Sequence, residues 1–235
     1  MVGANTLLTR TVGALVLTLG ALFSPPRLSA QYTVAGQVTL QELTGKNKKD
    51  IASAIVWLVP QGLTVRGADT IPAHTSIAMR GREFVPHIRL VTVGGSIAFP
   101  NQDPFSHNVF SNSDLGQFDL GLYRRRESRI ATFPTSGVYA VYCNIHARMT
   151  SFVVAVPTRL VTTVDKNGEF VLRDVPPGTY EVHGWHERAD ETRSRIAVSA
   201  NQTGVVVALD ARGFVTGQHL NKFGQPYTST RADRY

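Results

Sequence analysis

Three side chains that can bind a soft metal ion lie in one short run of this sequence. The run Val141-Tyr-Cys-Asn-Ile-His-Ala-Arg-Met149 spaces Cys143, His146 and Met149 three residues apart, and Cys143 is the only cysteine of the chain. A further histidine, His107, lies upstream in Pro104-Phe-Ser-His-Asn-Val-Phe110. One thiolate, two imidazoles and one thioether are the donors of a trigonal blue copper site with a weak axial sulfur. We therefore predict that these four residues bind one copper ion, which would cycle between Cu(I) and Cu(II).

Each of these residues also has a simpler interpretation. A lone cysteine is usually a small buried residue, a methionine fills a core, and a histidine is commonly hydrogen-bonded to its neighbours. Order and spacing favour the metal site. Cys143 ends the alternating run 137–143, His107 is predicted to end another strand, and the short loop after Cys143 can wrap three ligands around one cation.

The rest of the sequence has the pattern of an all-β protein. Its apolar stretches are short, rich in β-branched residues and bounded by Gly, Pro, Asn or Asp, and none keeps a 3.6-residue period for three turns. Such spacing is typical of sandwiches and barrels. With one cysteine there is no internal disulfide, so stability must come from a core. The predicted strands include 34–40, 54–59, 88–93, 151–156, 169–172, 179–182, 195–198 and 204–209.

Residues 71–156 resemble the cupredoxins, whose landmarks occur here in the family's order. The resemblance implies a Greek-key sandwich with copper at one end, and it implies that Asn108, directly after the first histidine, ties the two ligand loops together. The Cys-x2-His-x2-Met loop is similar to the short loop of the amicyanins. The matching segments are Val91-Thr-Val-Gly-Gly-Ser-Ile-Ala-Phe-Pro-Asn101, Ser106-His-Asn-Val-Phe110, Phe133-Pro-Thr-Ser-Gly-Val-Tyr139 and Tyr142-Cys-Asn-Ile-His-Ala-Arg-Met149.

The segments on either side resemble a different module. The run from Thr163 to Tyr180 has the D-x-x-G-x-F and V-P-P-G-x-Y elements of carboxypeptidase regulatory-like (transthyretin-like) domains. Strands 34–40 and 54–59 resemble the first two strands of such a domain. We therefore predict a copper domain, 71–156, inserted into a transthyretin-like β-sandwich made of 31–65 and 157–211. Residues 212–235 are predicted to be a tail, ordered only if it packs along a neighbouring surface.

The first thirty residues predict a secretory signal peptide. Arg10 precedes the apolar stretch 11–23, and small residues lead up to Ala30. The expected location is therefore periplasmic or extracellular. An uncleaved membrane anchor is the alternative. No later segment reaches membrane-spanning length, so no span is predicted after signal cleavage.

The charge distribution narrows the choice of partners. The formal net charge is +7, and Arg10 and Arg27 of the leader contribute two of these charges. A nucleic-acid binder would show clustered Lys and Arg with stacking aromatics, so no nucleic acid is expected. The densest basic cluster, Arg124-Arg-Arg-Glu-Ser-Arg129, is either a docking patch for an acidic redox partner or a solvated loop.

Together these features favour a secreted one-electron carrier that is not an enzyme. We find no flavin or haem motif and no Ser-His-Asp set. Two alternatives stay open: a non-redox periplasmic copper carrier or reservoir, and a structural or adhesive subunit with a copper-binding module. His183 and His186 are expected to face opposite sides of a strand, which argues against a second metal site. His87 either approaches the copper site or lies on a strand surface or in the core. The whole arrangement resembles secreted proteins labelled methylamine-utilisation or plastocyanin-like, a likeness that carries no substrate information.

Overall fold

The computed structural model describes residues 30–43, 48–62, 74–215 and 217–227. Strands dominate these residues, and their only helix is a short 3-10 turn, η1 (Lys48–Ser53), so the all-β prediction is confirmed. The predicted signal segment lies outside the described residues except for Ala30. Within the described part of the chain, no helix is long and apolar enough to cross a membrane.

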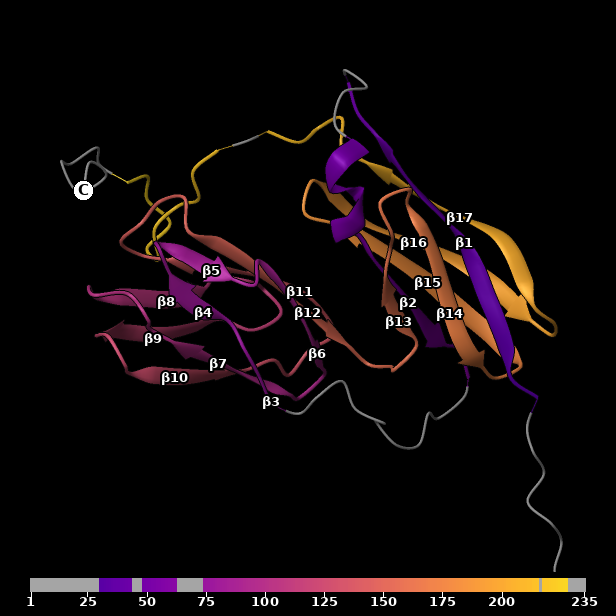
Figure 1. The fold of residues 1–235 in the computed structure, drawn as a ribbon, viewed down its shortest axis with the longest axis horizontal. Coiled ribbons are helices and arrows are strands. Elements are labelled where there is room, and N and C mark those ends of the chain that lie inside the picture. Colours follow the sequence, from indigo (N-terminus) through magenta and orange to yellow (C-terminus); the bar gives the residue numbers. More distant parts are fainter. Residues whose placement is uncertain (1–29, 44–47, 63–73, 216, 228–235) are drawn as a thin grey trace, which may run out of the picture.

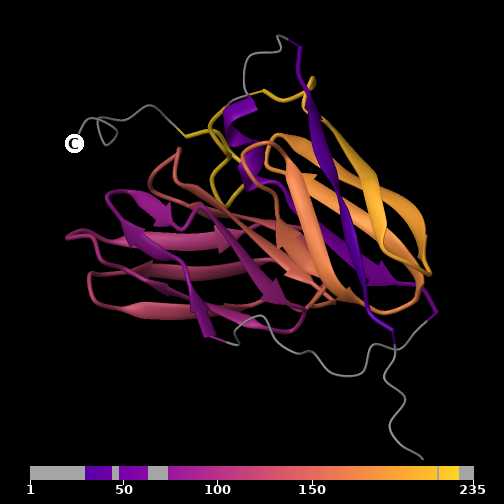
Figure 2. The same ribbon diagram turned by 45° about the vertical axis from the view of Figure 1, so that its right-hand side comes forward.

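The strands form two lobes that lie side by side (Figures 1 and 2). The central lobe contains β3 (His74–Ser76), β4 (Ala78–Arg80), β5 (Glu83–Val85), β6 (Ile88–Thr92), β7 (Ser96–Pro100), β8 (His107–Ser111), β9 (Phe118–Tyr123), β10 (Ser128–Thr132), β11 (Gly137–Cys143) and β12 (Thr150–Val156). The flanking lobe contains β1 (Tyr32–Gln41), β2 (Ile55–Pro60), β13 (Val161–Thr163), β14 (Glu169–Val175), β15 (Gly178–His186), β16 (Ala189–Val198) and β17 (Gln202–Asp210).

The central lobe has a five-stranded sheet in the order β6-β12-β11-β8-β9 and a three-stranded sheet in the order β10-β7-β3. The hairpin β4-β5 is a separate two-stranded sheet. Strand β11 shows how its sequence fits this arrangement, because successive side chains of a strand point to opposite faces. Tyr139, Val141 and Cys143 alternate along it and are all buried in the core of the lobe. The thiol of the only cysteine is therefore at the end of a core-facing row.

The flanking lobe joins segments from before and after the central lobe. Strand β1 pairs antiparallel with β14, where Val34 lies opposite Leu172. Strand β2 pairs antiparallel with β15, where Leu58 lies opposite Val182. Strands β1 and β2 thus pair with strands that follow residue 160.

An apolar contact joins the two lobes through β12. Val153 and Ala155 of this strand face the central core, whereas Val154 and Val156 pack against Trp57 and other side chains of β2 and β15. Burial on both faces explains why β12 is a nearly continuous apolar run instead of an alternating one.

One predicted boundary is wrong: His107 begins β8 and does not end a strand. The preceding strand, β7, ends at Pro100, and residues 101–106 connect it to β8. His107 pairs with Tyr123 of β9, and Cys143 pairs with Val109 of β8. Two predicted ligands therefore sit on paired strands of one sheet.

Candidate metal centre

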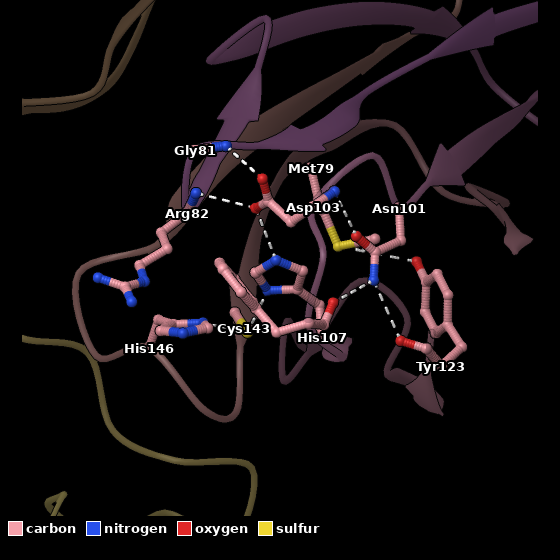
Figure 3. Close-up of polar contacts among 10 residues, drawn as sticks. Met79, Gly81, Arg82, Asn101, Asp103, His107, Tyr123, Cys143 and His146 are labelled. Atoms are coloured by element: carbon pink, nitrogen blue, oxygen red, sulfur yellow. Dashed lines mark hydrogen bonds and ion pairs between the residues drawn. The ribbon is translucent and has the colours of Figure 1, made fainter. Parts of the chain in front are cut away.

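Three of the predicted ligands converge at the end of the central lobe. One ligand atom each from His107, Cys143 and His146 lies within 4.8 Å of the others. The Sγ atom of Cys143 is 3.6 Å from Nδ1 of His107 and 3.6 Å from Nδ1 of His146 (Figure 3). Both imidazoles thus direct the same nitrogen to the thiol.

The backbone of the short loop closes on itself to produce this geometry. The Cys143 N–H donates to the Met149 carbonyl (3.1 Å), and the Met149 N–H donates to the His146 carbonyl (3.0 Å). These bonds bring His146 back beside Cys143. The Met149 side chain is buried and packs in the same core cluster as Cys143.

Burial sets the protonation of the two innermost ligands. His107 and Cys143 are fully buried, whereas His146 is partly exposed. Burial raises the pKa of the Cys143 thiol, against the backbone N–H groups of Ile145, Asn108 and His146, which lower it. Burial lowers the pKa of His107. The imidazole is therefore neutral near pH 7, as a metal ligand must be, while the thiol has to lose its proton when a metal binds.

Asp103 orients His107, and the sequence analysis did not identify it. Nε2 of His107 donates a hydrogen bond to Oδ2 of Asp103 at 2.9 Å, which leaves Nδ1 facing the thiol. Asp103 is only 5% exposed. A carboxylate behind a ligating histidine fixes the ring and its tautomer and raises its basicity.

A tight turn holds Asp103 in place (Figure 3). The two residues between β4 and β5, Gly81 and Arg82, have φ angles of 66° and 63°, and their N–H groups donate to Asp103 at 2.6 and 2.9 Å. Positive φ at both central positions is the pattern of a type I′ hairpin turn, and it is unfavourable for Arg82. The carboxylate stabilises this turn, while the turn fixes the carboxylate.

The charge of Asp103 follows from the same contacts. Burial alone would raise its pKa, but the N–H groups of Arg82 and Gly81 and the His107 ring lower it overall. The carboxylate therefore stays ionised and accepts hydrogen bonds. Asn101 supports it from the other side, since Oδ1 of Asn101 accepts the Asp103 N–H at 2.9 Å.

Asn108 lies directly after His107, and its side chain is bonded to the neighbouring strand β9. Its Nδ2 donates to Oδ1 of Asp119 on β9 at 2.6 Å. Its backbone N–H is the group that faces the Cys143 thiol. Asn108 therefore meets the second ligand segment through its backbone, next to the pairing of Val109 with Cys143.

The remaining candidate histidines have other partners. Nδ1 of His183 is 2.6 Å from Glu191, and His186 Nε2 is 2.9 Å from Ser53 Oγ. His87 Nε2 is 2.6 Å from Glu187, in the flanking lobe. In the described part of the chain, these three do not belong to the His107–Cys143–His146 group.

The predicted basic patch starts at the ligand end of the central lobe. Tyr123 pairs with His107, and the exposed residues Arg124, Arg125 and Arg126 follow it directly. Arg129 differs from these three. Its guanidinium lies 5.0 Å from the Tyr123 ring centroid and donates to the Leu122 carbonyl at 3.3 Å. Three exposed arginines therefore follow one another on the turn 124–126, and Arg148, inside the ligand loop, is also exposed.

Comparisons with known proteins give cupredoxins as structural neighbours. No family model and no curated protein matches the chain. A Cu(I) amicyanin variant is 18% identical and covers 37% of this chain and 87% of its own, with a TM-score of 0.34. A purple cupredoxin from Nitrosopumilus maritimus is 20% identical and covers 34% of this chain and 98% of its own, with a TM-score of 0.32. These matches cover less than two fifths of this chain, at 20% identity or less.

Proposed function

We propose that this protein is a secreted blue copper protein that carries one electron at a time, with His107, Cys143, His146 and Met149 as ligands. The observation that carries this proposal is the convergence of two imidazole Nδ1 atoms on one buried thiol, each at 3.6 Å. A buried carboxylate holds one of these imidazoles from behind. Such an arrangement has the parts of a metal centre and its outer support.

The donor set fits copper. Oxygen ligands, which Mg²⁺ and Ca²⁺ require, are not part of the described three-residue group. Zinc also accepts thiolate and imidazole, but a thioether such as Met149 favours Cu(I). When bound, copper supplies a one-electron redox couple. The residues of this chain hold one geometry for both oxidation states, because Asp103 and the closed 143–149 loop restrain the ligands.

The partly exposed ligand indicates where electrons enter and leave. His107 and Cys143 are fully enclosed, so a partner reaches the centre most directly at His146. The exposed turn 124–126 lies beside this end and would attract an acidic redox partner. Secretion by the leader 1–30 is part of the proposal, since a blue copper carrier of this kind works outside the cytoplasm.

The domain assignment also belongs to the proposal. The flanking lobe would be a transthyretin-like domain, 31–65 and 157–211, that hosts the copper domain 71–156. This assignment is supported by the pairing of β1 with β14 and of β2 with β15, since each pair joins a strand that precedes the central lobe in sequence to one that follows it. The tail 212–235 would be an appendage of this assembly.

Spectroscopy of the copper-loaded protein tests the proposal. Cu(II) added to the metal-free protein should produce an intense visible thiolate-to-copper absorption that saturates at one equivalent of copper per chain. Cys143→Ser should abolish that absorption, whereas His87→Ala, which alters a histidine outside the group, should preserve it. A colourless wild type, or a coloured Cys143→Ser variant, would contradict the ligand assignment.

Redox measurements separate the carrier from a copper reservoir. A carrier should exchange electrons rapidly in both directions, and Met149→Leu should keep the metal but raise the reduction potential, because the axial ligand tunes potential. A coloured protein that exchanges electrons only slowly would support the reservoir instead.

A further inference from the structure

The segment formed by residues 217–227, which we call the strap, crosses from the flanking lobe onto the central lobe (yellow in Figure 1). It has a structure of its own around Asn221. Oδ1 of Asn221 accepts the N–H groups of Phe223 (2.9 Å) and Gln225 (3.0 Å), and the Asn221 N–H donates to the Gln225 carbonyl (2.8 Å). The strap is therefore a folded turn.

The strap contacts three consecutive residues around the ligand thiol. The Tyr227 hydroxyl donates to the Cys143 carbonyl at 2.9 Å, and the Lys222 N–H donates to the Asn144 side chain at 2.9 Å. The His219 ring stacks on Tyr142, with ring centroids 4.3 Å apart and an interplanar angle of 22°. The strap therefore packs on residues 142–144, the same segment whose thiol faces His107 and His146.

The strap also reaches the segment that carries His107. Nζ of Lys222 is 2.6 Å from Oδ2 of Asp119. The other carboxylate oxygen of Asp119 accepts the Asn108 side chain, directly after His107. One residue of the strap, Lys222, is thus linked to both ligand-bearing segments, by its backbone N–H to Asn144 and by its side chain through Asp119.

We propose that the strap is part of the metal centre: it positions the Cys143 loop and closes the Tyr142–Asn144 side of the thiolate to solvent. The inner hydrogen bonds of the loop join Cys143, His146 and Met149, but the Cys143 carbonyl and the Asn144 amide find their partners in the strap. Removing the strap leaves the loop to open at lower free energy. The proposal that the strap positions a copper ligand rests on the proposed function. The proposal that it covers the thiol does not depend on copper.

The first test uses the metal-free protein. A chain ending at residue 216 should react with a chromogenic aromatic disulfide at Cys143 about tenfold faster than wild type or more, because local opening limits thiol access. A chain ending at residue 227, which keeps the strap, is the matched control and should react like wild type. Equal rates for both truncations would overturn the proposal. Circular dichroism establishes that each variant is folded.

The second test uses point variants, which keep the chain length and avoid gross unfolding. Tyr227→Phe removes one hydrogen bond and should speed both the thiol reaction and copper release to a chelator about two- to tenfold. Val215→Ser alters an exposed residue outside the strap and should change neither rate. Wild-type rates for Tyr227→Phe and for His219→Ala together would overturn the proposal.

The two tests also separate this inference from the proposed function. If the protein takes up no copper but the strapless chain still exposes its thiol, the cover is supported and the copper assignment fails. If copper binds with the expected colour and the truncations differ in neither thiol reactivity nor copper release, the copper assignment stands and the strap is not part of the centre.

Discussion

Each lobe of this protein buries histidines, and the two groups differ in what their ring nitrogens face. In the central lobe, His107 gives one nitrogen to Asp103 and keeps the other facing a thiol. In the flanking lobe, Nδ1 of His183 lies 2.6 Å from Glu191 and its Nε2 lies 3.1 Å from Glu181. His186 likewise uses Nε2 toward Ser53 and accepts the Arg188 N–H on Nδ1.

The difference separates a ligand from a structural histidine. Burial is common to both groups, and so is a carboxylate partner. A histidine can bind a metal only if one nitrogen keeps its lone pair directed to a shared centre, as the Nδ1 atoms of His107 and His146 do. In the flanking lobe, His183 lies between two carboxylates, and His186 bonds to Ser53 and to the Arg188 N–H, so neither ring shares a centre with a thiol.

The largest difference in copper affinity should come from replacing one histidine of each group in separate variants. His107→Gln removes a ligand and should weaken copper binding by more than ~100-fold, beyond the loss expected from an outer partner alone. His183→Gln should leave copper binding unchanged and lower the free energy of unfolding by about 1 kcal/mol, because buried hydrogen bonds are lost. Copper titrations and denaturant unfolding of both variants check this, and equal copper affinities would erase the distinction.

A smaller effect should follow from weakening the support of one ligand. Asp103→Asn keeps the size of the side chain but removes its charge, and it should lower copper affinity about 10- to 100-fold. The matched control is Asp210→Asn, an exposed residue paired with Arg212 in the flanking lobe. A copper affinity that is insensitive to Asp103→Asn would mean that the His107 ring is oriented by packing alone.

The contact between the lobes should depend on pH. The hydrogen bond to Glu187 raises the pKa of His87, and the same bond lowers the pKa of Glu187. The His87 contribution is complete below its ordinary pKa of 6.5 and is lost as pH rises through the raised value. The Glu187 contribution is complete above its ordinary pKa of 4.5 and is lost as pH falls through the lowered value.

The stabilisation by this pair should therefore be greatest in the mildly acidic range between pH 4.5 and 6.5 and decline on both sides. Since His87 is about half exposed, the total should stay under ~1 kcal/mol. Thermal melting across this range should show the effect, and His87→Gln should flatten the profile while leaving copper colour unchanged. An identical profile in the variant would show that the pair contributes nothing.

The smallest effect concerns the exposed turn at the ligand end. Electron exchange with an acidic partner should slow as salt rises, because charges are screened beyond ~8 Å at physiological ionic strength. Changing Arg124, Arg125 and Arg126 to Ser should slow association and flatten this dependence, with an unchanged visible spectrum. Stopped-flow rates measure both, and rates indifferent to salt and mutation would leave the turn as ordinary surface charge.

The sequence predicted the elements whose signals are local. The ligands of the 143–149 loop are close in sequence, so their spacing indicated the site, and the alternation along 137–143 predicted β11 and its end at Cys143. The strap and Asp103 required long-range information. Asp103 is four residues before His107 in a polar turn, a usable signal, but the Gly81–Arg82 turn that holds it is more than twenty residues away. The position of His107 within its strand was predicted wrongly, since β7 ends at Pro100 and β8 begins at His107.

Both tryptophans of the chain, Trp57 and Trp185, lie in the apolar contact between the lobes. Trp185 also packs against Phe152 of β12, with ring centroids 5.2 Å apart. Indole emission shifts to longer wavelength when the ring meets water, so tryptophan emission in this protein reports on the lobe interface. A separation of the lobes, whether caused by pH, a partner or loss of copper, should be visible without any attached dye.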